Sequence, residues 1–299
     1  MLFQPLRPYS LALTAERLGR FSDGIDHFDG KVFRRLIFAG GSPLLVSVSQ
    51  EGSAARARLR VALSGKGASR ADADALGLAL ARRMLGTEQE VKPFYRALRD
   101  DPVLGPPIRD FRGLRVAGAA SLFESLLTAI LAQQVNLKFA YSIRSELAER
   151  YGRCARIDGQ RYLGFPTPQR LSKLSEDELR KLRLSGAKAR AIRGLAEAFR
   201  SGALREAELA LAADEKVIEK LVALRGIGRW TAEIGLLRGL LRPDVFPAAD
   251  LAVVKVLAQQ LLGRESPAKE AEMREYSQRW RPWRSLALVY AYSEIARRA

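Results

Sequence analysis

The spacing of apolar residues changes along this chain, and the change limits the folds that it can adopt. In the first 65 residues, apolar side chains alternate with polar or basic ones over residues 31–38, 43–49 and 56–63, which is typical of strands. Beyond residue 113, nearly every segment repeats its apolar residues at the period of a helix. The sequence therefore predicts an α+β chain, with an N-terminal antiparallel β-sheet domain that includes helices, followed by a helical region.

The boundary between these two parts is marked by proline. Residues 71–85 continue the N-terminal part with a helical period. The segment at 100–113 contains three prolines and is typical of a connection. We therefore expect a β-rich N-terminal domain with its linker over residues 1–112 and a helical region over residues 113–299.

The chain is strongly basic. Its formal net charge is +17 and its pI is near 10.4, and the surplus of Lys and Arg is densest over residues 138–242. Such a charge favours a polyanionic partner. No apolar run approaches the roughly 20 residues that a membrane-spanning helix needs, so we expect no membrane partner.

One cysteine and one histidine restrict the chemistry further. Cys154 alone cannot form an internal disulfide or a four-thiolate zinc or iron–sulfur site. A lone His27 argues against histidine triads and multi-histidine metal sites. The amino terminus lacks the basic-then-apolar layout of a secretory signal, so we expect a reducing, cytoplasmic setting. Catalysis would then depend on carboxylates, aromatic rings and backbone groups.

The stretch LRGIGRWTA, residues 224–232, separates two segments of helical period. Its Gly-Ile-Gly predicts a tight turn, because glycine adopts left-handed backbone angles without strain. Gly226 and Gly228 leave their amides unshielded at the start of the second helix, where they can bind a phosphate oxygen, and Arg225 and Arg229 flank them with positive charge. Such a hairpin grips a DNA backbone without reading its sequence. The alternative is an ordinary helix–helix turn with glycine at a cap.

An aspartate follows 22 residues after the second glycine of the hairpin. Asp250 lies between the proline-containing turn DVFPAA and the apolar helical run LAVVKVL. An isolated aspartate in this position predicts an N-cap, where Asp is favoured. Together with the glycine hairpin, it also fits a carboxylate that acts on a ligand.

The hairpin, the Pro-containing turn and the aspartate at this spacing resemble the helix-hairpin-helix superfamily of DNA glycosylases. Within it, the chain is most similar to the 3-methyladenine DNA glycosylase II family, over nearly its whole length. FDGKVFRRLIFAGG and ARRMLG resemble the β-rich domain of that family, and AILAQQVN, LRGIGRWTAE, DVFPAAD and WRPWRSLALVYAY resemble its helical domains. The resemblance implies an all-α glycosylase region of two helical subdomains with the active-site cleft between them.

The resemblance also implies roles for individual residues. Asp250 would be the catalytic carboxylate, and Gly226 and Gly228 would supply phosphate-binding amides. The backbone carbonyls of Val222, Leu224 and Gly226 would hold a structural monovalent cation. No other cofactor is implied.

Residue 230 decides the type of reaction. Bifunctional relatives have a lysine at this position, whose amine attacks the sugar, whereas this chain has Trp230. Tryptophan cannot form a Schiff base, so the enzyme should use water and leave an abasic site. The alternative is that Trp230 only fills the core.

Two further positions follow from the resemblance. Gln134 falls where relatives insert a wedge, often leucine, into the gap left by the flipped base. Its alternative is a polar residue at a helix end. Tyr292 falls where the family often has a stacking tryptophan. With Trp230, it would line the base pocket with electron-rich rings and few hydrogen-bond donors, a surface that favours a flat cation.

These features together predict a monofunctional DNA N-glycosylase of base excision repair. It would act as a monomer on double-stranded DNA and release alkylated bases such as 3-methyladenine and 7-methylguanine. Two other functions fit the same motifs: a glycosylase for oxidised or deaminated bases, and a non-catalytic helix-hairpin-helix DNA-binding protein.

Overall fold

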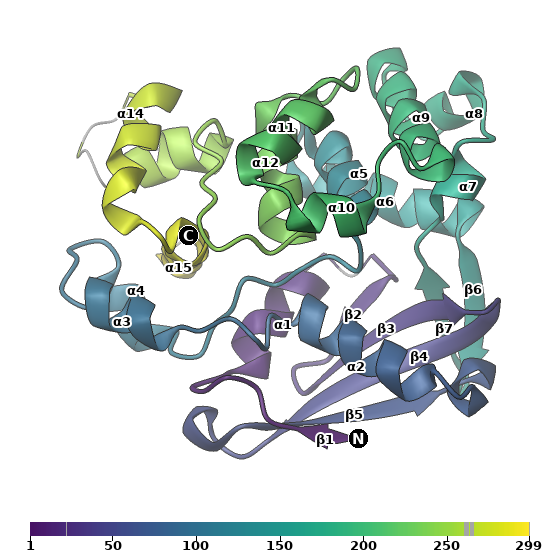
Figure 1. The fold of residues 1–299 in the computed structure, drawn as a ribbon, viewed down its shortest axis with the longest axis horizontal. Coiled ribbons are helices and arrows are strands. Elements are labelled where there is room, and N and C mark those ends of the chain that lie inside the picture. Colours follow the sequence, from purple (N-terminus) through teal and green to yellow (C-terminus); the bar gives the residue numbers. More distant parts are fainter. Residues whose placement is uncertain (22, 260–262, 264–265, 299) are drawn as a thin grey trace.

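The structure is a computed structural model that describes residues 1–21, 23–259, 263 and 266–298, apart from the side chains of Val256 and Arg298. Figure 1 shows a sheet with its own helices in the lower part and a larger group of helices above it. The fold class predicted from the sequence is confirmed. In the described part of the chain, no helix is both long enough and apolar enough to span a membrane.

The N-terminal sheet is antiparallel, with the strand order β1-β5-β4-β3-β2. Its strands are β1 (Leu2–Phe3), β2 (Asp26–Phe28), β3 (Val32–Ala39), β4 (Ser42–Glu51) and β5 (Arg58–Ser64). One face buries alternate apolar side chains such as Phe33, Val48 and Val61 against α1 (Leu11–Gly19) and α2 (Ala73–Met84). The three longer strands confirm the alternation read from the sequence, whereas β1, β2 and α1 were not predicted.

A second, two-stranded sheet interrupts the helical half, which the sequence had suggested to be all helix. It consists of β6 (Arg153–Ile157) and β7 (Gln160–Gly164). Ile157 and Tyr162 of this hairpin pack with Leu36 and Leu45 on the outer face of the N-terminal sheet. The hairpin therefore joins the helical half to the face that α1 and α2 leave uncovered.

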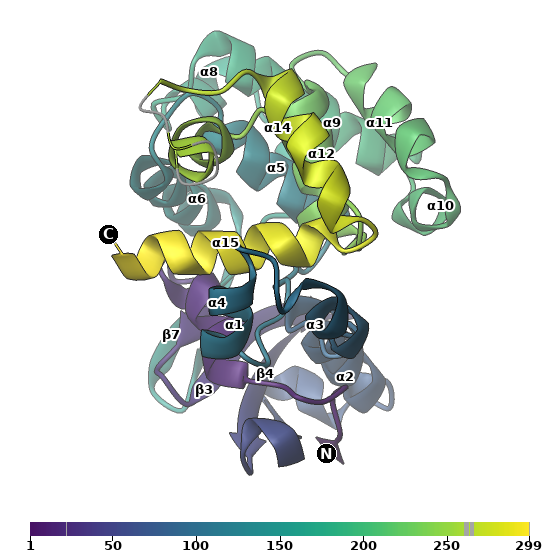
Figure 2. The ribbon, with the colours of Figure 1, turned by 90° about the vertical axis from the view of Figure 1, so that its left-hand side faces the viewer.

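The helical half is built from helices that range from 4 residues in α7 to 16 residues in α9 (Figures 1 and 2). They are α5 (Leu122–Ala132), α6 (Leu137–Tyr151), α7 (Pro168–Leu171), α8 (Glu176–Arg180), α9 (Gly186–Ser201), α10 (Glu206–Leu211), α11 (Asp214–Val222), α12 (Arg229–Ile234), α14 (Glu270–Tyr276) and α15 (Arg284–Arg298). In Figure 2, α15 lies between the other helices of this half and the N-terminal part. The apolar run after Asp250, which the sequence predicts to be helical, is observed as a helix from Leu251 to Gln259, and residues 260–262 lie outside the described residues.

The segment between the two halves is not a bare connection. It contains α3 (Lys92–Leu98) and α4 (Gly105–Asp110), and the second of these lies inside the proline-rich stretch. Pro106 follows the first residue of α4, a position where proline needs no backbone partner. Phe94 and Ile108 are buried in the same core as the helical half. Residues that we assigned to the N-terminal domain thus pack with the C-terminal one.

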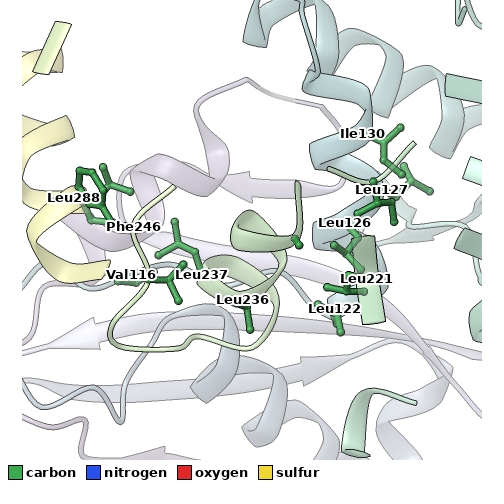
Figure 3. Close-up of a cluster of buried hydrophobic side chains, with 14 of the residues drawn as sticks. Val116, Leu122, Leu126, Leu127, Ile130, Leu221, Leu236, Leu237, Phe246 and Leu288 are labelled. Atoms are coloured by element: carbon green, nitrogen blue, oxygen red, sulfur yellow. The ribbon is translucent and has the colours of Figure 1, made fainter. Parts of the chain in front are cut away.

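Close packing of two helical segments forms the centre of that core. After α12 the chain continues as η3 (Gly235–Gly239), a π-helical segment that crosses α5. A Cβ atom on Gly235 would lie 2.6 Å from Leu126, and one on Gly239 would lie 2.7 Å from Leu122. Figure 3 shows Leu122 and Leu126 in the cluster that also contains Leu236. These two glycines therefore allow η3 to lie closer to α5 than any larger residue at either position would permit.

A buried charge network connects the two halves. Its members, all at most 5% exposed, are Asp23, Asp26, Arg35, Glu124 and Arg144. Arg35 bonds Asp26 at 2.7 Å and Glu124 at 2.6 Å, and Arg144 bonds Asp23, Asp26 and Glu124. Burial raises the pKa of Glu124, against the opposing charge of Arg35. The network fixes the sheet domain against α5 and α6.

Candidate active site

Asp250 and Trp230 meet directly. The indole Nε1–H of Trp230, in the first turn of α12, donates a hydrogen bond of 3.0 Å to Oδ2 of Asp250. The other carboxylate oxygen accepts the backbone N–H of Ala252 at 3.0 Å. Asp250 is thus an N-cap and at the same time a half-buried carboxylate with both oxygens oriented. The interpretation of Trp230 as a core filler does not account for this bond.

Both residues lie next to π-helical turns. The segment η3 follows α12, and η4 (Ala252–Leu257) begins two residues after Asp250. Leu240 donates its backbone N–H to the carbonyl of Gly235, five residues earlier, at 3.0 Å. Turns of this kind are rare and are frequent at functional sites. The backbone irregularity therefore coincides with the residues singled out from the sequence.

Tyr292 of α15 completes this group, although it lies 42 positions after Asp250 in the sequence. Burial raises the pKa of its hydroxyl well above the ordinary value, and the negative charge of Asp250 raises it further. We refer to Trp230, Asp250 and Tyr292 as the Asp250 cluster. The structure thus brings together the three residues that the sequence assigned to catalysis and base binding.

The surroundings of Tyr292 are less purely aromatic than we expected. Arg17 of α1 donates hydrogen bonds to Ser293 Oγ at 2.9 Å and to the carbonyl of Val289 at 3.3 Å, on the turn of α15 that carries Tyr292. The charges of Arg17 and Arg238 both lower the pKa of the Tyr292 hydroxyl. Two guanidinium groups therefore act electrostatically on Tyr292, in addition to the aromatic rings that the sequence suggested. No sequence pattern pointed to Arg17, which belongs to α1 in the N-terminal part.

The glycine hairpin has the expected shape. Gly226 has a φ of 87°, in the left-handed region, and an added Cβ would lie 2.6 Å from that of Ala191. Gly228 is the N-cap of α12, and an added Cβ there would meet nothing within 4 Å. Both glycines are exposed, and within the described residues their amides donate no hydrogen bond. Their proposed role in holding a phosphate is compatible with this geometry.

The two arginines of the hairpin differ in whether their charge is already paired within the protein. Arg229 bonds Glu215 at 2.6 Å and Glu233 at 3.2 Å, so its charge is already paired within the protein. Arg225 is exposed and has no ion pair among the residues that the structure describes. Of the two, Arg225 is the one that can meet a phosphate without breaking an existing interaction.

The hairpin carbonyls are only partly free for a cation. The carbonyl of Gly226 accepts the side-chain amide of Gln133 at 3.0 Å, and that of Leu224 accepts the backbone N–H of Ile227 at 3.1 Å. A carbonyl oxygen has two lone pairs, so each of these could offer a cation only its second one. The monovalent cation at Val222, Leu224 and Gly226 stays a prediction, and no step below depends on it.

The proposed wedge residue lies at an exposed turn after α5. Gln134 has a φ of 54°, an uncommon angle for a residue other than glycine. The neighbouring Gln133, which we did not single out, uses its amide to bridge the Gly226 carbonyl and Thr231 Oγ1, at 3.0 and 2.9 Å. Strained backbone at an exposed position is often kept for function. Through these two bonds, Gln133 links the turn that carries Gln134 to the glycine hairpin.

Comparison with known proteins places this geometry in a family. The model of the "HhH-GPD superfamily base excision DNA repair protein" matches residues 127–282. The chain is 34% identical over 205 residues to DNA-3-methyladenine glycosylase of Bacillus subtilis, covering 69% of this chain and 67% of that protein. It is 36% identical over 182 residues to DNA-3-methyladenine glycosylase 2 of Escherichia coli, covering 60% of each.

Solved structures of other proteins agree with this family assignment. The 3-methyladenine DNA-glycosylase from Archaeoglobus fulgidus has a TM-score of 0.82 over 98% of this chain and 97% of its own, and at 24% identity this likeness establishes the fold. The Schizosaccharomyces pombe 3-methyladenine DNA glycosylase, in complex with abasic DNA, has a TM-score of 0.56 and 25% identity over 67% of this chain and 95% of its own. Because the family match includes the hairpin, Trp230 and Asp250, we conclude that the chain belongs to the HhH-GPD superfamily of base excision DNA repair proteins and, within it, to the 3-methyladenine DNA glycosylase family.

Proposed function

We propose that this protein is a monofunctional glycosylase that acts as a monomer on duplex DNA and releases alkylated purines by hydrolysis. The observation that carries the proposal is the hydrogen bond from Trp230 to Asp250. An indole occupies the position of the nucleophilic lysine and holds the carboxylate in place. Relatives named for 3-methyladenine support the class of substrate.

The mechanism follows from the two oriented oxygens of Asp250. Breaking a base–sugar bond develops positive charge at C1′ of the sugar. A fixed carboxylate stabilises that charge and can align a water molecule for attack on it. Trp230 cannot form a covalent bond to the sugar, so the product is a free base and an intact abasic strand. The base must first be flipped out of the duplex, for which Gln134 is the proposed wedge.

Selectivity for alkylated bases should come mainly from the leaving group. The ring of Trp230 attracts a flat cation by about 0.5–2 kcal/mol. The positive charges of Arg17 and Arg238 near Tyr292 oppose that attraction. Binding affinity alone therefore discriminates only weakly between cationic and neutral bases. A purine alkylated at N3 or N7 is already cationic, however, and departs without a strong general acid, which the Asp250 cluster does not contain.

Release of bases from methylated DNA tests the substrate class. We expect 3-methyladenine and 7-methylguanine to appear in the chromatogram, with neutral ethenoadenine and hypoxanthine released more slowly from single-lesion duplexes. Efficient removal of 8-oxoguanine without any methylated base would favour the oxidised-base alternative. DNA binding without release of any base would favour a non-catalytic role.

The absence of a lyase step is tested by chemical trapping. Borohydride added during turnover reduces a Schiff base to a stable protein–DNA adduct, and we expect no such adduct because residue 230 is a tryptophan. Strand breaks should then appear only after hot alkali. A trapped species would show that another amine reaches the sugar, and Lys255, on the helix that follows Asp250, would be the first residue to replace.

A further inference from the structure

One polar group of the Asp250 cluster has no role in the mechanism above. The hydroxyl oxygen of Tyr292 is closed to solvent and makes no hydrogen bond with any described residue. Asp250 is near enough to raise the pKa of this hydroxyl both by its charge and as a hydrogen-bond acceptor, although no hydrogen bond of normal length and angle joins the two groups. A buried donor without an acceptor destabilises a folded protein, so its retention needs an explanation.

The same helix shows how such a hydroxyl is normally satisfied. Tyr290, two residues earlier on α15, has its hydroxyl 2.6 Å from that of Tyr95 and donates to the carbonyl of Leu114 at 3.2 Å. Tyr292 has neither kind of partner within the part of the chain that the structure describes. Because burial and the Asp250 charge both raise its pKa, the Tyr292 hydroxyl keeps its proton and is available as a donor.

The position of the hydroxyl limits what it can reach. If Asp250 stabilises charge at C1′, as the proposed function requires, and the flipped nucleotide displaces the contacts that close this hydroxyl to solvent, a donor beside Asp250 lies close to the glycosidic bond of the bound nucleotide. The edge of a purine next to that bond carries N3, which is a hydrogen-bond acceptor when unmodified. In 7-methylguanine N3 is free, whereas in 3-methyladenine a methyl group occupies it.

We propose that the Tyr292 hydroxyl donates a hydrogen bond to N3 of the flipped purine and so distinguishes lesions with a free N3 from those alkylated there. When the C1′–N9 bond breaks, its electron pair moves into the base, and a donor at N3 stabilises the electron density that gathers on that edge. The inference rests on the proposed function and adds to it a residue that ranks the substrates.

The test uses two lesions as internal controls for each other. Tyr292→Phe removes the hydroxyl and keeps the ring, so single-turnover release of 7-methylguanine should fall about 3- to 10-fold, the effect of one hydrogen bond. Release of 3-methyladenine should change by less than twofold. An equal fall for both lesions would show that the hydroxyl acts through Asp250 or water, and no change for either would show that it is idle. Both results would overturn the inference and leave the proposed function standing.

Tyr290→Phe is the matched control on the same helix. It removes a hydroxyl that has two partners, so the melting temperature should fall, and any effect on release should be the same for both lesions. In contrast, Tyr292→Phe should leave the melting temperature unchanged or raise it, because it removes an unpaired buried group. If the wild-type protein released neither lesion, the proposed function itself would fail, and the inference with it.

Discussion

Replacing Asp250 with asparagine is expected to lower the rate of base excision by at least about 100-fold, the usual loss when one preorganised electrostatic group is removed. Asparagine keeps the N-cap, because it serves that role as well as aspartate. It cannot supply the negative charge at C1′. Affinity for lesion-containing DNA should stay the same or increase, since a carboxylate near phosphates is repelled by them. Single-turnover excision and equilibrium binding to the same duplex measure the two effects separately.

A control distinguishes loss of catalysis from loss of charge alone. Asp177→Asn makes the same chemical change on α8, at a side chain that is 87% exposed. It should leave excision unaltered. Retention of wild-type turnover by the Asp250 variant would instead mean that the carboxylate is only a helix cap.

Replacing Arg35 with methionine is expected to destabilise the protein by about 3–5 kcal/mol, because breaking a buried ion pair leaves charge without compensation. The change would leave Asp26, Glu124 and Asp23 with Arg144 alone. Thermal denaturation should show a melting temperature lower by roughly 6–20 °C.

The comparison variant comes from the same sheet. Arg60 on β5 pairs with Glu51, and its side chain is 58% exposed. Arg60→Met should change stability by less than about 1 kcal/mol, the usual value of an exposed ion pair. If the two variants had the same melting temperature, the buried charge network would not be what holds the sheet domain against α5 and α6.

Features encoded in neighbouring residues were the ones that the sequence could predict. The strands β3 to β5 follow from alternation, the hairpin from Gly226 and Gly228, and the N-cap from Asp250 and the apolar run after it. The strand pair β6–β7 was missed because its five-residue strands are too short to show a period against the helices on either side. Strands β1 and β2 are shorter still.

Contacts between distant residues could not be read in the same way. Motifs suggested Trp230, Asp250 and Tyr292 one at a time, and only the structure shows the indole bonded to the carboxylate. Arg17 reaches α15 from 272 positions away in sequence, and the charge network joins residues up to 121 apart. No local pattern marks such partners, because a buried arginine looks like a surface arginine until the fold is known.

The bridge made by Gln133 has a consequence for how related sequences can diverge. Its amide donates to Thr231 Oγ1 and to a backbone carbonyl at residue 226, so one side chain serves two segments about 100 positions away. A substitution at 133 that loses the amide leaves the threonine hydroxyl without its donor, and a substitution at 231 leaves the amide with only one acceptor. The two positions should therefore change together through evolution, as residues in physical contact do. Gln134 makes no such bond among the described residues, so this bridge places no constraint on its side chain.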